Sequence, residues 1–224
     1  MKPTEPEIIF EDNHLLAVNK PFGMLSQGDN TQDLSVFDWG KEYIRITYQK
    51  PGNVYLALLH RLDRPTGGLL LLAKTSKAAA RVSKQFQERK VQKVYLALTE
   101  NVPDPPTGSL QHHLKKLPDK NIMRAYRKSV HASKPASLDY RVLRSAKGKA
   151  IVEVRPKTGR RHQIRVQLAS IGCTIRGDVK YGKTDFNPDK SICLFAHKLE
   201  LLHPVKKEPL LLEAPMPDLD WWRL

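Results

Sequence analysis

Short segments in which apolar and polar residues alternate limit most strongly what this chain can fold into. Such alternation is typical of β-strands that bury one face and expose the other. In one of these segments Lys93 and Tyr95 should project together, away from the apolar side. The segments that show the pattern are residues 93–98, 138–142 and 150–154. They predict a fold that is built mainly on β-sheet.

Two other stretches extend this prediction. Residues 8–10 and 15–18 flank the turn pair Asp12-Asn13 and predict a hairpin. The uninterrupted apolar run at residues 69–73 predicts a strand that is covered on both faces.

Apolar residues also repeat at helical spacing in two places. Ser76 is a suitable N-cap for a helix over residues 77–89. A second helix is predicted over residues 160–171, with Thr158 as its cap and Gly172 at its end. Strands outnumber these helices and do not alternate with them regularly. An α+β fold with a largely antiparallel sheet is therefore expected.

The 224-residue chain contains no repeat, no low-complexity tract and no shift in composition, so a single domain over residues 1–224 is expected. The proline-rich segment 103–106 and the basic stretch at 112–116 predict a long surface connection within it. The apolar run at 69–73 is far too short to cross a bilayer, and the amino end has no apolar stretch of signal-peptide type. A cytoplasmic location without a membrane partner is expected.

The net charge is the first indication of a partner. Lys and Arg number 38 against 23 Asp and Glu, which gives a formal charge of +15. An excess of this size favours a polyanionic partner such as nucleic acid, and it favours a monomer in solution. Cys173 and Cys193 suit a reducing compartment and are too few for a disulfide framework. His112 and His113 have no third ligand at zinc-site spacing, so no metal is expected.

Charged residues concentrate at residues 60–68, directly before the apolar run. Asp63 lies there between Arg61 and Arg64, whose charges favour its ionised form. Such a loop can present one carboxylate at the edge of a sheet. The alternative is a turn whose charges simply face water.

A second cluster, at residues 155–165, is strongly basic and coincides with the start of the second predicted helix. Free backbone N–H groups and the positive end of the helix dipole suit phosphate. His162 and Arg165 are three residues apart and share a helix face, whereas Ile164 turns to the core. The alternative is a solvated basic helix.

These residues carry a resemblance to a known family. The segment HRLDRPTGGLLLLAKT at 60–75 resembles the signature loop and strand of the RluA-type pseudouridine synthases. Other matching segments follow the family's order: NKPFGM at 19–24, KVYLAL at 93–98, RPKTGRRHQIRVQLASIGCTIRGDVKYG at 155–182 and FAHKLELLHP at 195–204. The resemblance covers nearly the whole chain. It implies an isomerase that converts a particular uridine of transfer or ribosomal RNA to pseudouridine without cofactor or metal.

The resemblance also implies a fold and a catalytic site. The family's catalytic domain has a mixed, mainly antiparallel sheet in two halves, with flanking helices and a central cleft, and no appended S4-type module is expected. Asp63 falls on the catalytic aspartate, Tyr95 on the active-site tyrosine beside the target base, and Arg165 on the basic residue that pairs with the aspartate. The sequence departs from the family at Gly67, where serine is common, and at Gln167, where histidine is common.

The reaction requires the target uracil to leave the stack, which costs a few kcal/mol that phosphate contacts can offset. Arg61 falls on the arginine associated with displacing the target nucleotide, and its planar cation can stack on bases. The residues predicted to contact RNA are Arg61, Arg64, Lys93, Arg160, Arg161 and His162. Whether Asp63 attacks the sugar, attacks the base or removes a ribose proton stays open.

A non-catalytic RNA-binding protein on the same fold is the rival interpretation, and Asp63 distinguishes the two because a pure binder needs no carboxylate facing phosphates. A hydrolase is a weaker rival, because the sequence offers no second carboxylate and no Ser/Cys–His pair at a recognisable motif.

Overall fold

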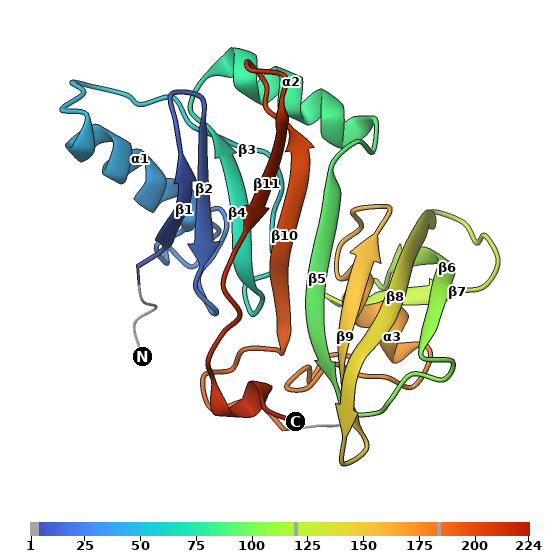
Figure 1. Ribbon diagram of the computed structural model, residues 1–224. Helices are drawn as coiled ribbons and strands as arrows, with labels where there is room; N and C mark the ends of the chain where they lie inside the picture. The colour runs from blue at the N-terminus through green and yellow to red at the C-terminus, as the bar shows by residue number, and fades with distance from the viewer. Residues whose placement is uncertain (1–4, 119–120, 183–184) are drawn as a thin grey trace. The chain divides into compact units, whose positions relative to one another are not determined.

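The structure is a computed structural model that describes residues 5–118, 121–182 and 185–224 (Figure 1). Contacts within the chain divide it into two compact units. Unit 1 comprises Met1–Gln92 and Ala196–Pro215, and unit 2 comprises Lys93–Phe195 and Met216–Leu224. The expectation of a single catalytic domain over residues 1–224 stays a prediction.

Unit 1 contains a sheet with the strand order β1-β2-β4-β10, in which β3 also pairs with β4 and β11 with β10. The β1–β2, β2–β4, β3–β4 and β10–β11 pairs are antiparallel. The elements of this unit are β1 (Glu7–Glu11), β2 (Leu15–Lys20), α1 (Val36–Thr47), β3 (Ala57–Leu58), β4 (Gly67–Ala73), α2 (Ser76–Gln87), β10 (Leu194–Leu202) and β11 (Pro209–Glu213). The first two residues of β10 belong to unit 2.

The strands predicted for unit 1 are confirmed. Asp12 closes the β1–β2 hairpin because its carboxylate accepts hydrogen bonds from the N–H groups of His14 (2.8 Å) and Leu15 (2.7 Å). Strand β4 is buried over its whole length, as its continuous apolar run predicts.

The helices of unit 1 require two corrections. The predicted helix at 77–89 is α2, but its cap is Thr75, whose hydroxyl accepts a hydrogen bond from the N–H of Ala78 (3.2 Å). Ser76 is instead the first helical residue. Helix α1 is absent from the predictions, although Ser35 caps it by accepting from the N–H of Asp38 (3.2 Å).

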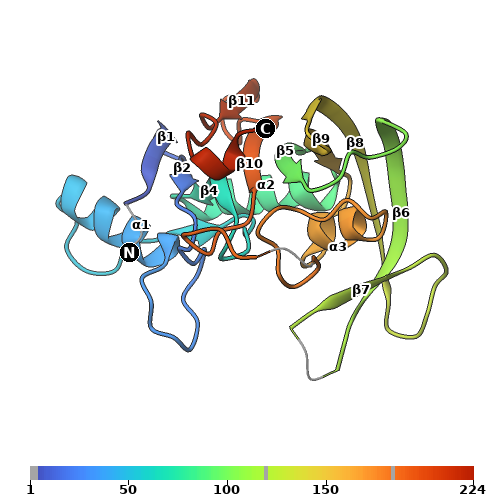
Figure 2. The ribbon, with the colours of Figure 1, turned by 90° about the horizontal axis from the view of Figure 1, so that it is seen from below.

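Unit 2 contains an antiparallel sheet with the strand order β5-β9-β8-β6-β7 (Figures 1 and 2). Its elements are β5 (Gln92–Thr99), β6 (Thr107–Lys116), β7 (Met123–Tyr126), β8 (Lys134–Ala146), β9 (Lys149–Pro156), α3 (Gln163–Ala169) and the 3₁₀ helix η1 (Asp220–Trp222). The alternating segments at 93–98, 138–142 and 150–154 lie in β5, β8 and β9, so these predicted strands are confirmed.

Two predictions for unit 2 are wrong. The stretch at 112–116 is no surface connection: it lies in β6, which pairs with β8 along one edge and with β7 along the other. The helix predicted over 160–171 is much shorter, and Thr158 does not cap it. The Thr158 hydroxyl instead accepts from the N–H of Ser137 in β8 (3.0 Å) and donates to Oε1 of Gln163 (2.7 Å).

The predicted α+β class is confirmed, because in both units the described strands pair mostly antiparallel, with α1 and α2 in unit 1 and α3 in unit 2, and because the similar solved structures are pseudouridylate synthase domains. The expected central cleft stays a prediction. Within the described ranges, no helix has the length and apolar character that crossing a membrane requires.

Candidate functional site

Asp63 lies in the loop between β3 and β4, and the residues on both sides of it are anchored to the segment that follows β2. The hydroxyl of Ser26 accepts a hydrogen bond from the N–H of Leu62 (3.0 Å) and donates one to the Leu62 carbonyl (2.9 Å). The N–H of Gly23 donates to the carbonyl of Arg64 (3.0 Å). The structure therefore brings together the segments at 19–24 and 60–75 and fixes the backbone that carries Asp63.

Lys20, at the end of β2, is the buried centre of this anchoring and was not singled out from the sequence. Its side chain is 1% exposed, and Nζ donates to the carbonyls of Met24 (2.7 Å), Pro21 (2.9 Å) and Arg64 (3.3 Å). Burial lowers the pKa of Lys20 to about 7; the negative charge of Asp63 opposes this shift and the charge of Arg64 adds to it. The amino group of Lys20 therefore lies within electrostatic range of Asp63.

Gly67 and Gly68, which follow this loop, lie so close to other parts of unit 1 that a side chain would not fit without movement. A Cβ on Gly67 would lie 2.9 Å from the ring of Phe22. Gly68 has a φ of +104°, and a Cβ there would collide with the backbone of Ala196. The serine that is common in the family at position 67 has no room here unless Phe22 moves.

The two arginines of the loop differ in their surroundings. Arg61 is exposed. Arg64 is also exposed, but its Nε donates to the carbonyl of Gly23 (3.0 Å) and its Nη2 pairs with Asp33 (2.7 Å). Arg64 thus contributes to the loop's anchoring, whereas Arg61 projects a charged group to solvent.

Arg165 lies in α3, whose residues Gln163 to Leu168 are all buried. Its guanidinium makes a bidentate pair with Asp178, with Nε–Oδ2 of 2.7 Å and Nη2–Oδ1 of 2.8 Å. The side chains of Arg165 and Asp178 are 3% and 1% exposed. A buried charge needs such a partner. The interpretation of this segment as a solvated basic helix is therefore wrong.

Tyr181 joins this pair to other parts of unit 2. The guanidinium of Arg165 lies 5.3 Å from the centre of the Tyr181 ring. The Tyr181 hydroxyl accepts a hydrogen bond from the N–H of Met123 in β7 (2.8 Å) and lies 2.8 Å from Nδ1 of His162. His162 is buried and has a φ of 51°, which a residue with a Cβ seldom adopts.

The remaining predicted site residues of unit 2 lie on β5 and before α3. Lys93 and Tyr95 are half-buried on one face of β5, as predicted. Nζ of Lys93 lies 3.5 Å from the carbonyl of Thr158, and burial lowers the pKa of Lys93. Nε of Arg160 donates to a backbone carbonyl of β8 (3.0 Å), and Arg161 is exposed.

Sequence reasoning missed Lys20, Asp178 and Tyr181, although all three lie inside the segments that carry the resemblance. The signal for Lys20 was a cation that directly follows the apolar strand LLAVN. The signal for Asp178 was its isolation, because it is the only acidic residue between positions 155 and 182 of a basic segment. Both patterns indicate a buried charge that needs a partner.

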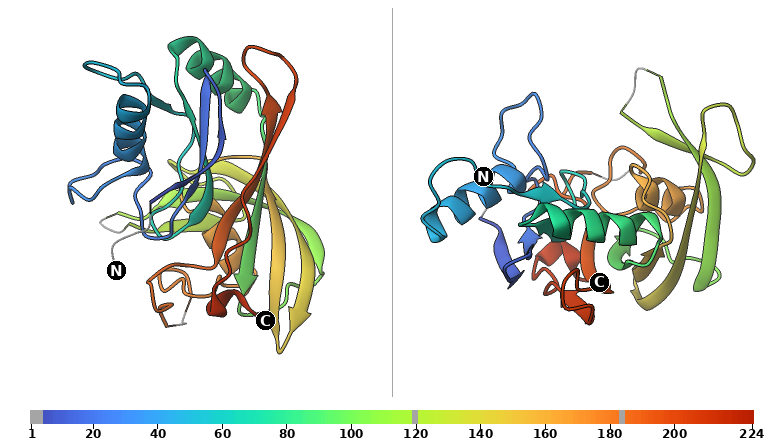
Figure 3. Two further views of the ribbon diagram at one scale, coloured as in Figure 1. Left: turned by 60° about the vertical axis from the view of Figure 1, so that its left-hand side comes forward. Right: turned by 90° about the horizontal axis from the view of Figure 1, so that it is seen from above.

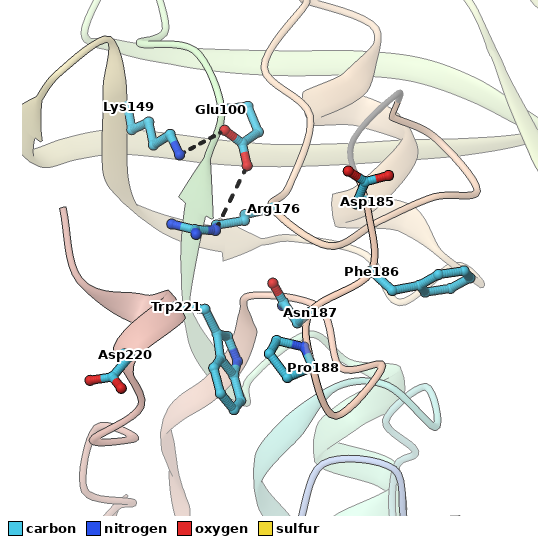
Figure 4. Close-up of a pocket in the computed structure, with 9 residues that line it drawn as sticks. All are labelled: Glu100, Lys149, Arg176, Asp185, Phe186, Asn187, Pro188, Asp220 and Trp221. Atoms are coloured by element: carbon cyan, nitrogen blue, oxygen red, sulfur yellow. Dashed lines mark ion pairs between the residues drawn. The ribbon is translucent and has the colours of Figure 1, made fainter.

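Figure 4 shows a pocket of about 530 Å³ in unit 2 that is separate from these residues. In it Glu100 pairs with Lys149 (3.2 Å) and Arg176 (3.9 Å). Its lining residues are Glu100, Lys149, Arg176, Asp185, Phe186, Asn187, Pro188, Asp220 and Trp221. None of the predicted site residues lines it. Within the described part of the chain, no three His, Cys, Asp or Glu side chains cluster in a way that could hold a metal ion.

Comparison with known proteins identifies the family. The profile of RNA pseudouridylate synthases matches residues 14–170, which span the Asp63 loop, Tyr95 and Arg165. The chain belongs to this family. It is an RluA-type member, and it is therefore an isomerase that acts on RNA.

The similar proteins agree with this assignment. Ribosomal large subunit pseudouridine synthase D of Nitrosomonas europaea is 34% identical over 95% of this chain and 62% of its own length. Synthase C of Rickettsia bellii is 33% identical over 96% of this chain and 70% of its own length. The chain thus spans about two thirds of the length of these relatives.

Solved structures give the same result. The human RNA pseudouridylate synthase domain containing 4 superimposes with a TM-score of 0.80 at 28% identity, covering 96% of this chain and 90% of that one. A second human protein, RNA pseudouridylate synthase domain containing 1, gives a TM-score of 0.76 at 25% identity. The match covers 100% of this chain and 89% of that one.

Proposed function

We propose that the protein converts uridine to pseudouridine in the RNA of the large ribosomal subunit, and that Asp63 acts directly on the target nucleotide. The observation that carries this proposal is the loop around Asp63. It lies in the segment with the family's signature, and both of its flanks are fixed by hydrogen bonds to Ser26 and Gly23. The relatives named for the large ribosomal subunit support ribosomal RNA as the substrate. Transfer RNA stays the alternative substrate.

The reaction is an isomerisation, so the product nucleotide contains the same atoms as the substrate. The bond from ribose C1′ to uracil N1 breaks, the base turns, and a bond from C1′ to C5 forms. The proton on C5 is lost, and the former N1 gains one. Asp63 must be ionised to attack as a nucleophile or to remove a proton. The amino group of Lys20, which carries three hydrogen bonds to backbone carbonyls, lies within electrostatic range of Asp63.

Tyr95 and Arg165 are proposed as the other residues of the reaction. Tyr95 offers a ring that can stack on the base and a hydroxyl that can transfer a proton. Arg165 supplies a permanent positive charge, and its bidentate pair with Asp178 fixes the plane of the guanidinium. In this proposal Asp178 is a positioning residue.

The proposed RNA contacts divide by exposure. Arg61 and Arg161 are exposed and can reach phosphates or bases directly. Arg64 and Arg160 are predicted RNA contacts whose guanidinium groups also bond the protein's own backbone. Lys93 and His162 are more buried, and their contacts with RNA would be limited to a nucleotide that enters the site.

Asp63→Asn tests the proposal, because it removes the charge and keeps the size of the side chain. We expect pseudouridine formation in large-subunit ribosomal RNA to fall by about a thousandfold or more, with RNA affinity and unfolding unchanged. The matched control is Asp29→Asn, an exposed carboxylate in another loop of unit 1, which should retain activity. Turnover by Asp63→Asn would contradict the proposed role. Modification of transfer RNA alone would contradict the proposed substrate.

A further inference from the structure

The β6–β7 hairpin of unit 2 carries an unusual set of cross-strand neighbours. Its register places Lys115 directly opposite Arg124 and His113 directly opposite Tyr126. Successive residues of a strand point to opposite faces, so these four side chains share one face of the hairpin. We call Lys115, Arg124, His113 and Tyr126 the hairpin basic face.

The other face of the hairpin is packed against the unit. Leu114 is buried in a cluster with Ala136 and with Val166 of α3, and Met123 and Ala125 pack against that cluster. The core therefore fixes which way the hairpin faces. The hairpin basic face must turn away from this core.

The Lys115–Arg124 pair costs stability in the free protein. Like charges directly opposite on neighbouring strands repel, and side chains in such positions lie about 5 Å apart at Cβ. Among the described residues neither of them has an ion-pair partner. The guanidinium of Arg124 lies over the ring of Tyr126, 5.4 Å from its centre. Stability alone does not explain two cations in this register.

The surroundings strengthen the positive charge. Between residues 111 and 134 the sequence has one acidic residue, Asp119, which lies outside the described residues. The basic residues of that stretch are Lys115, Lys116, Lys120, Arg124, Arg127, Lys128 and Lys134. Strand β7 is the edge strand of the sheet of unit 2, and Figures 2 and 3 show β6 and β7 at the outer side of that unit. A basic hairpin at the edge of a sheet is suited to contact an extended polyanion.

We propose that the hairpin basic face binds the phosphate backbone of the RNA, outside the residues assigned to the reaction. One phosphate between Lys115 and Arg124 would bond both cations and remove their repulsion. The rings of His113 and Tyr126 beside them offer apolar surface to a sugar or an unpaired base. The inference rests on the proposed function for the identity of the RNA.

The hairpin is also joined to the proposed catalytic arginine. The N–H of Met123 in β7 donates to the hydroxyl of Tyr181, and the ring of Tyr181 lies against the guanidinium of Arg165. RNA on the hairpin basic face would therefore be bound by the same unit that carries Arg165. Such binding adds affinity and sets the orientation of the RNA.

Lys115→Glu separates binding from stability. It replaces the repulsive pair by a Glu–Arg pair, so the melting temperature should stay equal or rise. Affinity for a synthetic stem–loop RNA of the large subunit should fall about tenfold at low salt. The slope of log affinity against log salt should decrease by about 1 or more. Arg144→Glu, an exposed residue of β8 with the same change of charge, should weaken binding far less.

Lys115→Gln provides a second variant in case the reversal of charge disturbs the fold. Lys115→Gln should keep the melting temperature of the wild type. It removes one charge instead of reversing it, so the slope of log affinity against log salt should change about half as much as in Lys115→Glu. Equal affinity of Lys115→Glu and Arg144→Glu would overturn the inference, as would a loss of stability in Lys115→Gln that explains its weaker binding. Turnover by the wild-type protein tests the proposed function separately, so the two failures are distinguishable.

Discussion

Asp63 and Arg165 are both charged residues of family segments, but the two units support them in different ways. Asp63 is partly exposed, and backbone hydrogen bonds to its neighbours Leu62 and Arg64 fix its position. Arg165 is almost completely buried, and the side chain of Asp178 fixes it. Because the flanks of the loop are held through Leu62 and Arg64, we expect unit 1 to keep its fold when the charge of Asp63 is removed. The helix of unit 2 cannot lose one member of its pair at so low a cost.

Asp178→Asn should have the largest effect on stability. It removes the negative charge of the carboxylate that makes the bidentate pair with the buried guanidinium of Arg165, so we expect the free energy of unfolding to fall by about 3–5 kcal/mol. Urea denaturation measures this change. The control is Asp139→Asn, which removes a carboxylate from a surface pair with Lys157 and should cost about 1 kcal/mol or less. Equal losses in the two variants would remove the contrast between the units.

Lys20→Met should have the second-largest effect, because this one buried side chain bonds three backbone carbonyls in and beside the loop of unit 1. The variant leaves the carbonyls of Pro21, Met24 and Arg64 without their shared donor. Each buried carbonyl without a partner costs about 1–3 kcal/mol, partly recovered where the backbone can move. We expect a loss of about 2–3 kcal/mol at pH 7, measured by urea denaturation.

The same variant has a pH signature. The pKa of Lys20 is lowered from 10.5 to about 7, so between these values the unfolded chain holds a proton that the folded protein has released. The free energy of unfolding of the wild type, measured relative to Lys20→Met, should therefore rise from pH 7 towards pH 10. The gain is about 1.4 kcal/mol for each unit of pKa difference. A flat difference across this range would mean that Lys20 keeps its charge when buried.

Local patterns in the sequence predicted most of the strands and one of the helices. The alternation in β5, β8 and β9 and the apolar run of β4 reflect burial on one or two faces, which a sequence records directly. Strand β6 was missed because its exposed face is polar and it follows several prolines. Helix α3 was predicted too long because the basic residues before it suit a helix but bond to β8 instead.

The candidate site divides in the same way. The loop around Asp63 is marked by adjacent residues, so a sequence can indicate it. Asp178 lies thirteen positions from Arg165, and Lys20 lies 44 positions from Arg64. Only the folded backbone decides that each of these pairs meets. Partners of buried charges are therefore the part of the site that needed the structure.

Tyr181→Phe should have the smallest effect, and it tests whether side chains other than Asp178 support Arg165. The ring under the guanidinium remains, while the hydroxyl that serves Met123 and His162 is lost. We expect urea denaturation to show a loss of about 1 kcal/mol. Tyr126→Phe in the same unit, whose hydroxyl has no hydrogen-bond partner among the described residues, should cost almost nothing. If Tyr181→Phe also costs nothing, the hydrogen bonds of the Tyr181 hydroxyl do not contribute to the support of Arg165, and the contrast with Asp178 becomes sharper.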